Sequence, residues 1–137
     1  MIPNKACPVV LRLAGIRVQV LAFEHPFARR QLIKGTVEPG ESPAVTALRE
    51  LHEEAGIDGA ALGRDLGCWD AGFEGQVWSF HVCDVAVQLP DSWVHHAPDD
   101  GGLDFRFFWQ SLDQLPTTGW HEVHERALRW LTRHLQG

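Results

Sequence analysis

Residues 35–57 are GTVEPGESPAVTALRELHEEAGI, a loop bounded by glycine followed by a segment of helical periodicity. Apolar residues recur every three or four positions over residues 43–55, which predicts a helix with one buried stripe. Ser42 can cap the first amides, Pro43 suits the first helical position, and Gly56 can take the left-handed conformation that ends a helix. The sequence therefore predicts one helix with well-defined ends.

Three glutamates, Glu50, Glu53 and Glu54, share one face of this predicted helix because steps of three and four residues return to the same side. Their charges repel one another near the C-terminal end, where the helix dipole also disfavours negative charge. Arg49 alone cannot neutralise three carboxylates. Clustered carboxylate oxygens, with no thiolate or paired imidazoles nearby, prefer hard cations such as Mg²⁺ or Mn²⁺. The alternative is a solvated acidic face, which is the common role of a glutamate-rich helix.

The loop before the helix adds candidate binding groups. Gly35 and Gly40 bracket a turn whose backbone can approach a ligand closely, and its carbonyl groups could complete the shell of a cation. Lys34 and the pair Arg29 and Arg30 lie just upstream. Their cationic side chains could contact phosphate oxygens. The segment thus combines a candidate cation site with candidate anion-binding residues.

The spacing within residues 35–57 matches the box of the Nudix hydrolase family, Gly-x5-Glu-x7-Arg-Glu-U-x-Glu-Glu-x-Gly-U with U aliphatic, at every defined position. Average residue frequencies give a chance match odds of about 10⁻⁹ per window. The resemblance implies an α/β fold, a Nudix-type α/β/α sandwich with a mixed β-sheet, as a single domain over residues 1–137. It also implies metal-dependent hydrolysis of a phosphoanhydride bond in a nucleoside diphosphate linked to another moiety.

The resemblance also assigns roles within the box. The implied metal ligands are the carbonyl of Gly35 and the carboxylates of Glu50, Glu53 and Glu54, with Mg²⁺ or Mn²⁺ as the expected cofactor. Arg49 and Glu41 resemble an ion pair that orients the catalytic helix against the loop. Glu50 and Glu53 are candidates to take the proton from the attacking water.

A downstream loop supplies the base, or a further ligand, in many members of the family. Here the candidates are Asp99, Asp100, Asp104 and Glu74, of which Asp100 is preferred. For each of them taken singly, an ordinary solvated loop acid is the more common role. Trp93 lies in the polar stretch of residues 89–103. It is the tryptophan that we propose for stacking on a nucleotide base, with packing in the core as the alternative.

The substrate is less well marked than the chemistry. ADP-ribose-type members carry a proline where this chain has Gly72, and the chain contains no tyrosine, which dinucleoside tetraphosphate types often carry. Lys34, directly before Gly35, resembles members that act on longer polyphosphate chains. This favours nucleoside or dinucleoside polyphosphates, bound through Lys34, Arg30 and Trp93. The alternatives are a nucleotide-sugar or ADP-ribose pyrophosphatase, a non-catalytic nucleotide-binding module, and an isoprenyl diphosphate isomerase of the same fold.

Composition limits the remaining classes. The 137 residues suit one compact domain, and the formal net charge of −6 gives no field that would attract a nucleic-acid polymer or an anionic membrane. Three cysteines without a CxxC pair are typical of free thiols in a reducing compartment, so we expect a cytoplasmic protein. The expected partner is a small nucleotide-type substrate, and a homodimer stays open.

Outside the box, patterning predicts the other elements. Strands are expected at 8–14 and 16–23, forming a hairpin at Gly15, and further strands at 62–69, 76–87 and 105–109. Residues 89–103 are predicted to form a polar loop, and residues 120–135 an amphipathic helix.

Overall fold

The computed structural model describes residues 1–98 and 101–136. Within these residues the elements follow in the order β1 (Lys5–Val9), β2 (Leu11–Ala14), β3 (Arg17–His25), β4 (Arg29–Gln31), β5 (Gly35–Thr36), α1 (Pro43–Ala55), β6 (Ala61–Asp70), β7 (Val77–Asp84), β8 (Trp93–Ala97), β9 (Leu103–Ser111) and α2 (Glu122–Leu135).

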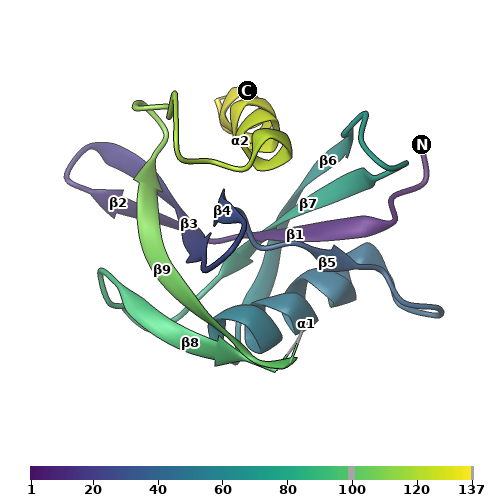
Figure 1. The fold of residues 1–137 in the computed structure, drawn as a ribbon, viewed down its shortest axis with the longest axis horizontal. Coiled ribbons are helices and arrows are strands. Elements are labelled where there is room, and N and C mark those ends of the chain that lie inside the picture. The colour runs from purple at the N-terminus through teal and green to yellow at the C-terminus, as the bar shows by residue number, and fades with distance from the viewer. Residues whose placement is uncertain (99–100, 137) are drawn as a thin grey trace.

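The strands form two sheets, which lie between the two helices (Figure 1). One sheet has the order β5-β1-β7-β6 and is mixed, because β1 and β7 are parallel while the other pairs are antiparallel. The second sheet has the order β2-β3-β9-β8, with β4 paired to β3, and its pairs are antiparallel. The predicted α/β class with helices on both sides is confirmed, but the strands are divided between two sheets rather than forming one.

The predicted first strand is in fact two strands. Residue Val10 separates β1 from β2, and its carbonyl accepts a hydrogen bond of 2.9 Å from the amide of Leu21. The chain changes sheets there, although the run of β-favouring residues shows no turn signal. The predicted hairpin at Gly15 is confirmed, with Ala14 paired to Arg17.

Two apolar layers hold the helices on the sheets. The alternation of side chains along β3 serves both layers: Val20 and Ala22 join the cluster that α2 covers, while Leu21 and Phe23 join the cluster that α1 covers. Strand β1 divides its side chains in the same way. The two helices are therefore attached to opposite faces of a common core.

Strand β8 corrects the predicted polar loop at 89–103. It pairs with β9 in a register that places Trp93 opposite Phe107 and Ala97 opposite Leu103. The two histidines at its centre hid the strand, because they reduce the apolar alternation by which a strand is recognised. The partner of His95 is the Glu53 carbonyl on α1, 42 residues away in sequence, so only the folded chain shows why this histidine belongs to a strand.

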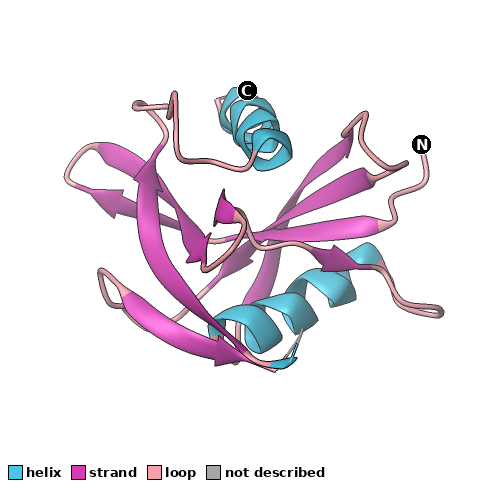
Figure 2. Ribbon diagram, viewed as in Figure 1, coloured by secondary structure: helices cyan, strands magenta, loops and turns pink. Residues whose placement is uncertain are grey.

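Helix α1 has the predicted ends (Figure 2). The Ser42 hydroxyl accepts a hydrogen bond of 3.2 Å from the amide of Val45, and Gly56 has φ of 73°. Helix α2 begins at Glu122, slightly later than predicted, with His121 as its N-cap. Neither of these two helices is both long and apolar enough to cross a membrane, as judged over the described residues.

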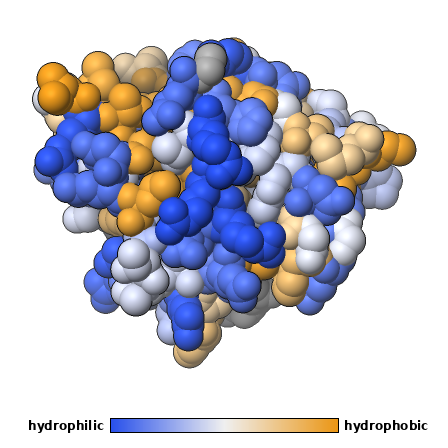
Figure 3. Space-filling view, turned by 90° about the horizontal axis from the view of Figure 1, so that it is seen from above, coloured by the Kyte–Doolittle hydropathy of each residue, from blue (hydrophilic) through white to orange (hydrophobic). Residues whose placement is uncertain are grey.

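Seen from the side of α2, polar side chains cover the middle of the surface, and apolar side chains gather at the left, where the β2–β3 hairpin lies (Figure 3). The exposed apolar residues of this hairpin are Leu13, Ile16 and Val18. The outer face of α2 is thus the solvated side of an amphipathic helix, in agreement with its predicted pattern.

Candidate metal and substrate site

Helix α1 brings its carboxylates to the backbone of β5. Glu50 and Glu54 are buried, and Glu53 is partly exposed. The Glu50 carboxyl group lies so close to Gly35 that a methyl group on Gly35 would overlap it. Gly35 lies in strand β5 and has no positive φ, so the structure gives this position a packing reason for glycine rather than the turn expected from the sequence. Glu50 therefore packs against Gly35 and is hydrogen-bonded to Glu54, while the role of these three residues as metal ligands stays a prediction.

Arg49 connects the helix to the preceding loop. Its Nε and Nη2 donate to the two oxygens of Glu41 at 2.7 and 2.9 Å, and Nη2 also donates to the carbonyl of Thr36 at 2.9 Å. Its Nη1 donates to Glu50 Oε1 at 2.8 Å and to Glu53 Oε2 at 3.2 Å. This guanidinium therefore fixes the loop, the helix and two of the acidic side chains relative to one another.

Glu41 is the acceptor at the centre of the loop. Besides Arg49, the hydroxyl of Thr46 donates to its Oε1 at 2.7 Å, and the amide of Glu38 donates at 3.1 Å. These hydrogen bonds, that from Arg49 first, lower the pKa of Glu41 to about 2. The carboxylate is charged at every physiological pH, so the predicted orienting ion pair is permanent.

The buried acids carry an electrostatic cost. Burial raises the pKa of Glu50, against the opposing effects of the hydrogen bond with Glu54 and of the charge of Arg49. Among the described residues, no group of three or more His, Cys, Asp or Glu side chains is arranged to hold a metal ion, and Glu53 is bound to Arg49. The donor set nevertheless fits a hard cation, because two carboxylates meet in a buried place beside the Gly35 backbone.

Lys34 lies on the Glu54 side of this group. Its Nζ donates to Gln76 Oε1 at 3.2 Å and lies 5.0 Å from the ring centroid of Trp78. Burial and then the charge of Lys5 lower the pKa of Lys34, while Glu54 raises it. Gln76 also accepts from Trp78 Nε1 at 2.9 Å, so it holds the ammonium and the indole together. Sequence reasoning did not find Gln76, because an isolated glutamine gives no signal.

Arg30 and Trp93 are placed differently from the other predicted binding residues. The Arg30 guanidinium stacks 4.6 Å above the ring of Phe108, and no hydrogen bond or ion pair within the described residues joins it to the α1 glutamates. Trp93 stacks on Phe107, with centroids 5.0 Å apart, and its Nε1 donates to the Ala55 carbonyl at 3.2 Å. One face of the indole is covered, so stacking on a base stays a prediction that would use the other face.

The downstream acids have separate outcomes. Asp99 and the preferred Asp100 lie outside the described residues. The Asp104 carboxyl group is hydrogen-bonded to Nδ1 of His96 at 2.8 Å and lies on the exposed end of β9. Glu74 has a positive φ of 50° in the β6–β7 turn and is close enough to Lys34 to raise its pKa. Glu74 is therefore the described downstream acid that acts on a residue of the site.

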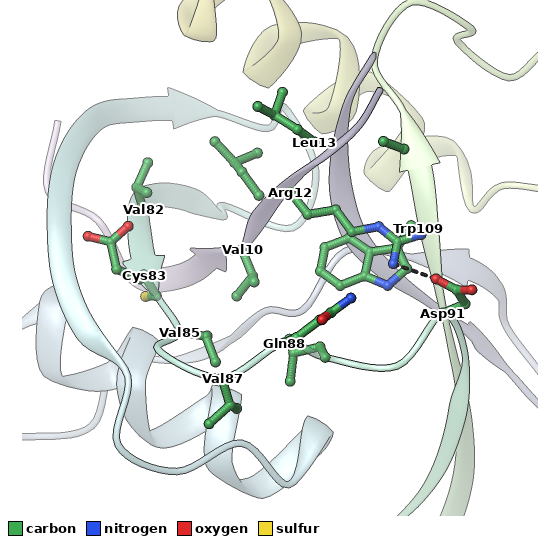
Figure 4. A pocket seen from close by; sticks show the side chains of 14 residues that line it. Val10, Arg12, Leu13, Val82, Cys83, Val85, Val87, Gln88, Asp91 and Trp109 are labelled. Atoms are coloured by element: carbon green, nitrogen blue, oxygen red, sulfur yellow. Dashed lines mark hydrogen bonds and ion pairs between the residues drawn. The ribbon is translucent and has the colours of Figure 1, made fainter. Parts of the chain in front are cut away.

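A separate cavity of about 510 Å³ lies between β2 and the end of β7 (Figure 4). Arg12 stacks 4.4 Å above Trp109 at its wall and binds Asp91 at 2.8 Å. The described residues that line it include none from α1. This cavity is therefore distinct from the acidic site.

Comparison with known proteins identifies the class to which this fold and site belong. The NUDIX domain model matches residues 7–131, nearly the whole chain. The chain belongs to the NUDIX family.

Individual relatives match shorter segments. The chain is 43% identical over 60 residues to ADP-ribose pyrophosphatase of Haemophilus influenzae, covering 40% of this chain and 28% of the relative. It is 40% identical over 79 residues to the asymmetrical bis(5'-nucleosyl)-tetraphosphatase of Sus scrofa, covering 52% of this chain and 54% of that protein. The matched segments thus span about half or less of these curated relatives.

A solved structure is similar over almost the whole length. The crystal structure of an ADP-ribose pyrophosphatase from Streptococcus suis has a TM-score of 0.67 to this chain, at 17% identity, covering 99% of this chain and 94% of the other. At this level of identity the likeness shows a shared fold.

Proposed function

We propose that this protein is a divalent-metal-dependent hydrolase that cleaves a phosphoanhydride bond in a small nucleoside-diphosphate-type substrate. The observation that carries the proposal is the assembled box: Glu50 and Glu54 are buried, Glu50 packs against Gly35, and Arg49 joins the helix to the loop through Glu41. Buried like charges destabilise a fold unless a partner balances them, and a cation would do so.

Mg²⁺ or Mn²⁺ would be held by Glu50, Glu53, Glu54 and the carbonyl of Gly35, and when bound it supplies the positive charge that a pyrophosphate needs before a nucleophile can approach. Arg49 keeps Glu50 and Glu53 oriented by hydrogen bonds to one oxygen of each. Glu53, whose side chain is 31% exposed, is the box carboxylate most accessible to a water molecule. Glu53, Glu50 and Asp100 are the proposed proton acceptors.

For the substrate we favour nucleoside or dinucleoside polyphosphates. Lys34 supports this choice, because its ammonium is held beside Glu54 and could bind a further phosphate. The similarity to a tetraphosphatase agrees with it. The similarity to ADP-ribose pyrophosphatases supports the second candidate, hydrolysis of ADP-ribose or a nucleotide sugar.

The proposed cell compartment and partner are supported by the cysteines and by the net charge. The three cysteines are free, and Cys7 and Cys83 are buried, which supports a reducing compartment such as the cytoplasm. The net charge of −6 supports a small nucleotide rather than a nucleic-acid polymer as the partner.

A panel of nucleoside triphosphates, dinucleoside polyphosphates, ADP-ribose and nucleotide sugars tests the proposal, with products identified by chromatography. We expect Mg²⁺-dependent cleavage that chelation abolishes, fastest on a polyphosphate. Faster cleavage of ADP-ribose would replace the favoured substrate by the second candidate. Nucleotide binding without release of any phosphorylated product would identify a non-catalytic module and contradict the proposal.

A further inference from the structure

The last turn of α1 carries two of the three glutamates that this helix contributes to the box, and it has carbonyl groups that need donors from outside the helix. The amides of Gly56 and Ile57 donate to the carbonyls of His52 and Leu51, at 2.9 and 3.4 Å. The carbonyls of later residues in a helix have no intrahelical partner. Negative side chains near this end also oppose the helix dipole. The turn that presents Glu53 and Glu54 is therefore the part of α1 most in need of support.

Strand β8 supplies that support through two side chains. His95 Nε2 lies 3.0 Å from the carbonyl oxygen of Glu53, and Trp93 Nε1 donates to the carbonyl of Ala55 at 3.2 Å. A carbonyl oxygen can only accept, so Nε2 of His95 carries the proton. Residues 93 and 95 alternate with Val94, which is exposed, so both donors face the helix from one side of the strand.

The contact is closely packed as well as hydrogen-bonded. A Cβ built on Gly56 would lie 2.7 Å from Nδ1 of His95, which means that the imidazole rests directly on the end of the helix. One face of the Trp93 indole stacks on the ring of Phe107, with an interplanar angle of 12°. Both donors are therefore packed against neighbouring groups, and β8 runs beside the C-terminal end of α1 (Figure 1).

We propose that His95 and Trp93 are positioning residues of the acidic site: their hydrogen bonds to the last turn of α1 hold the Glu53 and Glu54 carboxylates where they bind a divalent cation. The inference rests on the proposed function for its catalytic consequence. Groups that orient metal ligands indirectly change metal affinity by roughly 10–100-fold when they are removed. In this proposal Trp93 supports the helix through its hydrogen bond to the Ala55 carbonyl, a role separate from the predicted stacking on a base.

The test compares His95→Ala with His95→Gln, whose amide N–H can again donate to the Glu53 carbonyl. Mn²⁺ binding is measured by calorimetry and by electron paramagnetic resonance, well below the melting temperature of each variant. We expect His95→Ala to bind Mn²⁺ about 10-fold more weakly, and His95→Gln to recover most of that affinity. Substrate turnover should fall through kcat, with KM little changed.

Two further variants complete the experiment. Trp93→Phe keeps the ring on Phe107 but removes the donor, so it should weaken Mn²⁺ binding in the same direction as His95→Ala. Val94→Ala is the matched control on the same strand, because its side chain is 52% exposed and it should bind Mn²⁺ as the wild type does.

The inference is overturned if His95→Ala and Trp93→Phe lower the melting temperature but bind Mn²⁺ as tightly as the wild type does, since that is a purely structural role. Its failure is distinguishable from failure of the proposed function. A wild type that binds Mn²⁺ and loses affinity in His95→Ala, but hydrolyses no phosphoanhydride, supports the positioning role and contradicts the hydrolase. A wild type that binds no Mn²⁺ overturns both.

Discussion

Arg49 shows how much one side chain can organise at this site. Its five hydrogen bonds reach Glu41, Glu50, Glu53 and the carbonyl of Thr36, so all five N–H donors of a guanidinium have acceptors. A lysine carries one point charge and cannot fork in this way. This geometry explains why the box has arginine rather than lysine at this position, because the guanidinium bridges groups that one ammonium could not reach together.

Replacement of Glu54 by glutamine separates function from stability. The buried carboxyl group of Glu54 is hydrogen-bonded to that of Glu50, and a neutral amide can keep this hydrogen bond while it removes a buried charge and a proposed metal ligand. We expect Glu54→Gln to lose roughly 100-fold or more in turnover, with a free energy of unfolding equal to or slightly above that of the wild type. Product chromatography and urea denaturation measure the two quantities. Turnover at the wild-type rate would show that Glu54 has no role in the reaction.

Replacement of Gly35 by alanine tests the packing of the box. The added methyl group would overlap the Glu50 carboxyl group, which is buried and cannot move freely. Overpacking of this kind costs about 1–3 kcal/mol. We therefore expect Gly35→Ala to lower both the free energy of unfolding and the affinity for Mn²⁺. Unchanged values in urea denaturation and calorimetry would contradict the close approach.

At the scale of the element, α1 is fixed at two places. Arg49 attaches its middle to the loop before it, and β8 supports its last turn through Trp93 and His95. The apolar stripe of Ala47, Leu51 and Ala55, on the side of the helix away from Arg49, packs in the core. Acidic residues destabilise the C-terminal end of the helix. Strand β8 compensates, because it supplies hydrogen-bond donors to the last carbonyl groups, and Arg49 of the helix itself supplies a positive charge beside the carboxylates.

A pair of glycine substitutions isolates the contribution of β8. Gly56 and Gly40 have similar positive φ values of 73° and 79°, but a Cβ on Gly56 meets His95 while a Cβ on Gly40 meets nothing within 4 Å. Both alanine variants should lose about 1–2 kcal/mol from the left-handed backbone, and Gly56→Ala should lose more. The extra loss should disappear in the double variant with His95→Ala. Equal losses in urea denaturation of the two single variants would argue against a tight His95 contact.

At the scale of the whole molecule, the site forms where α1, β1, β5 and β7 meet, and α2 closes the other side of the core. His124 of α2 lies in that core: its Nδ1 accepts from the amide of Leu32 at 3.0 Å, and its ring packs on Trp78. Trp78 also lies under the Lys34 ammonium, so one indole contacts both His124 of α2 and the residue that precedes the box.

Buried His124 should make stability depend on pH. Burial first, then the charges of Lys34 and His121, hold the pKa of His124 well below its ordinary value. The unfolded chain takes up a proton at this residue near pH 6.5 while the folded chain does not, so protons favour unfolding and stability falls as pH drops below about 6.5. His124→Asn keeps an acceptor for Leu32 without titrating. We expect the fall between pH 7.5 and 5.5 to be smaller in this variant, measured by urea denaturation, and equal slopes would refute the assignment to His124.

The sequence by itself determined the local features of this protein. The ends of α1, the hairpin at Gly15 and the spacing of Glu50, Glu53 and Glu54 follow from caps, turns and periodicity that involve residues a few positions apart. The family assignment also follows from such spacing, and the match over residues 7–131 confirms it.

Only the tertiary structure decided how the box is supported. The bond from Lys34 to Gln76 and the bond from His95 to Glu53 each join residues 42 positions apart, and the break at Val10 depends on which sheet each strand enters. Neither a single glutamine nor two histidines in a polar segment carries a periodic signal. Their roles arise when the chain closes, because a hydrogen-bond partner distant in sequence becomes a neighbour only in the folded core.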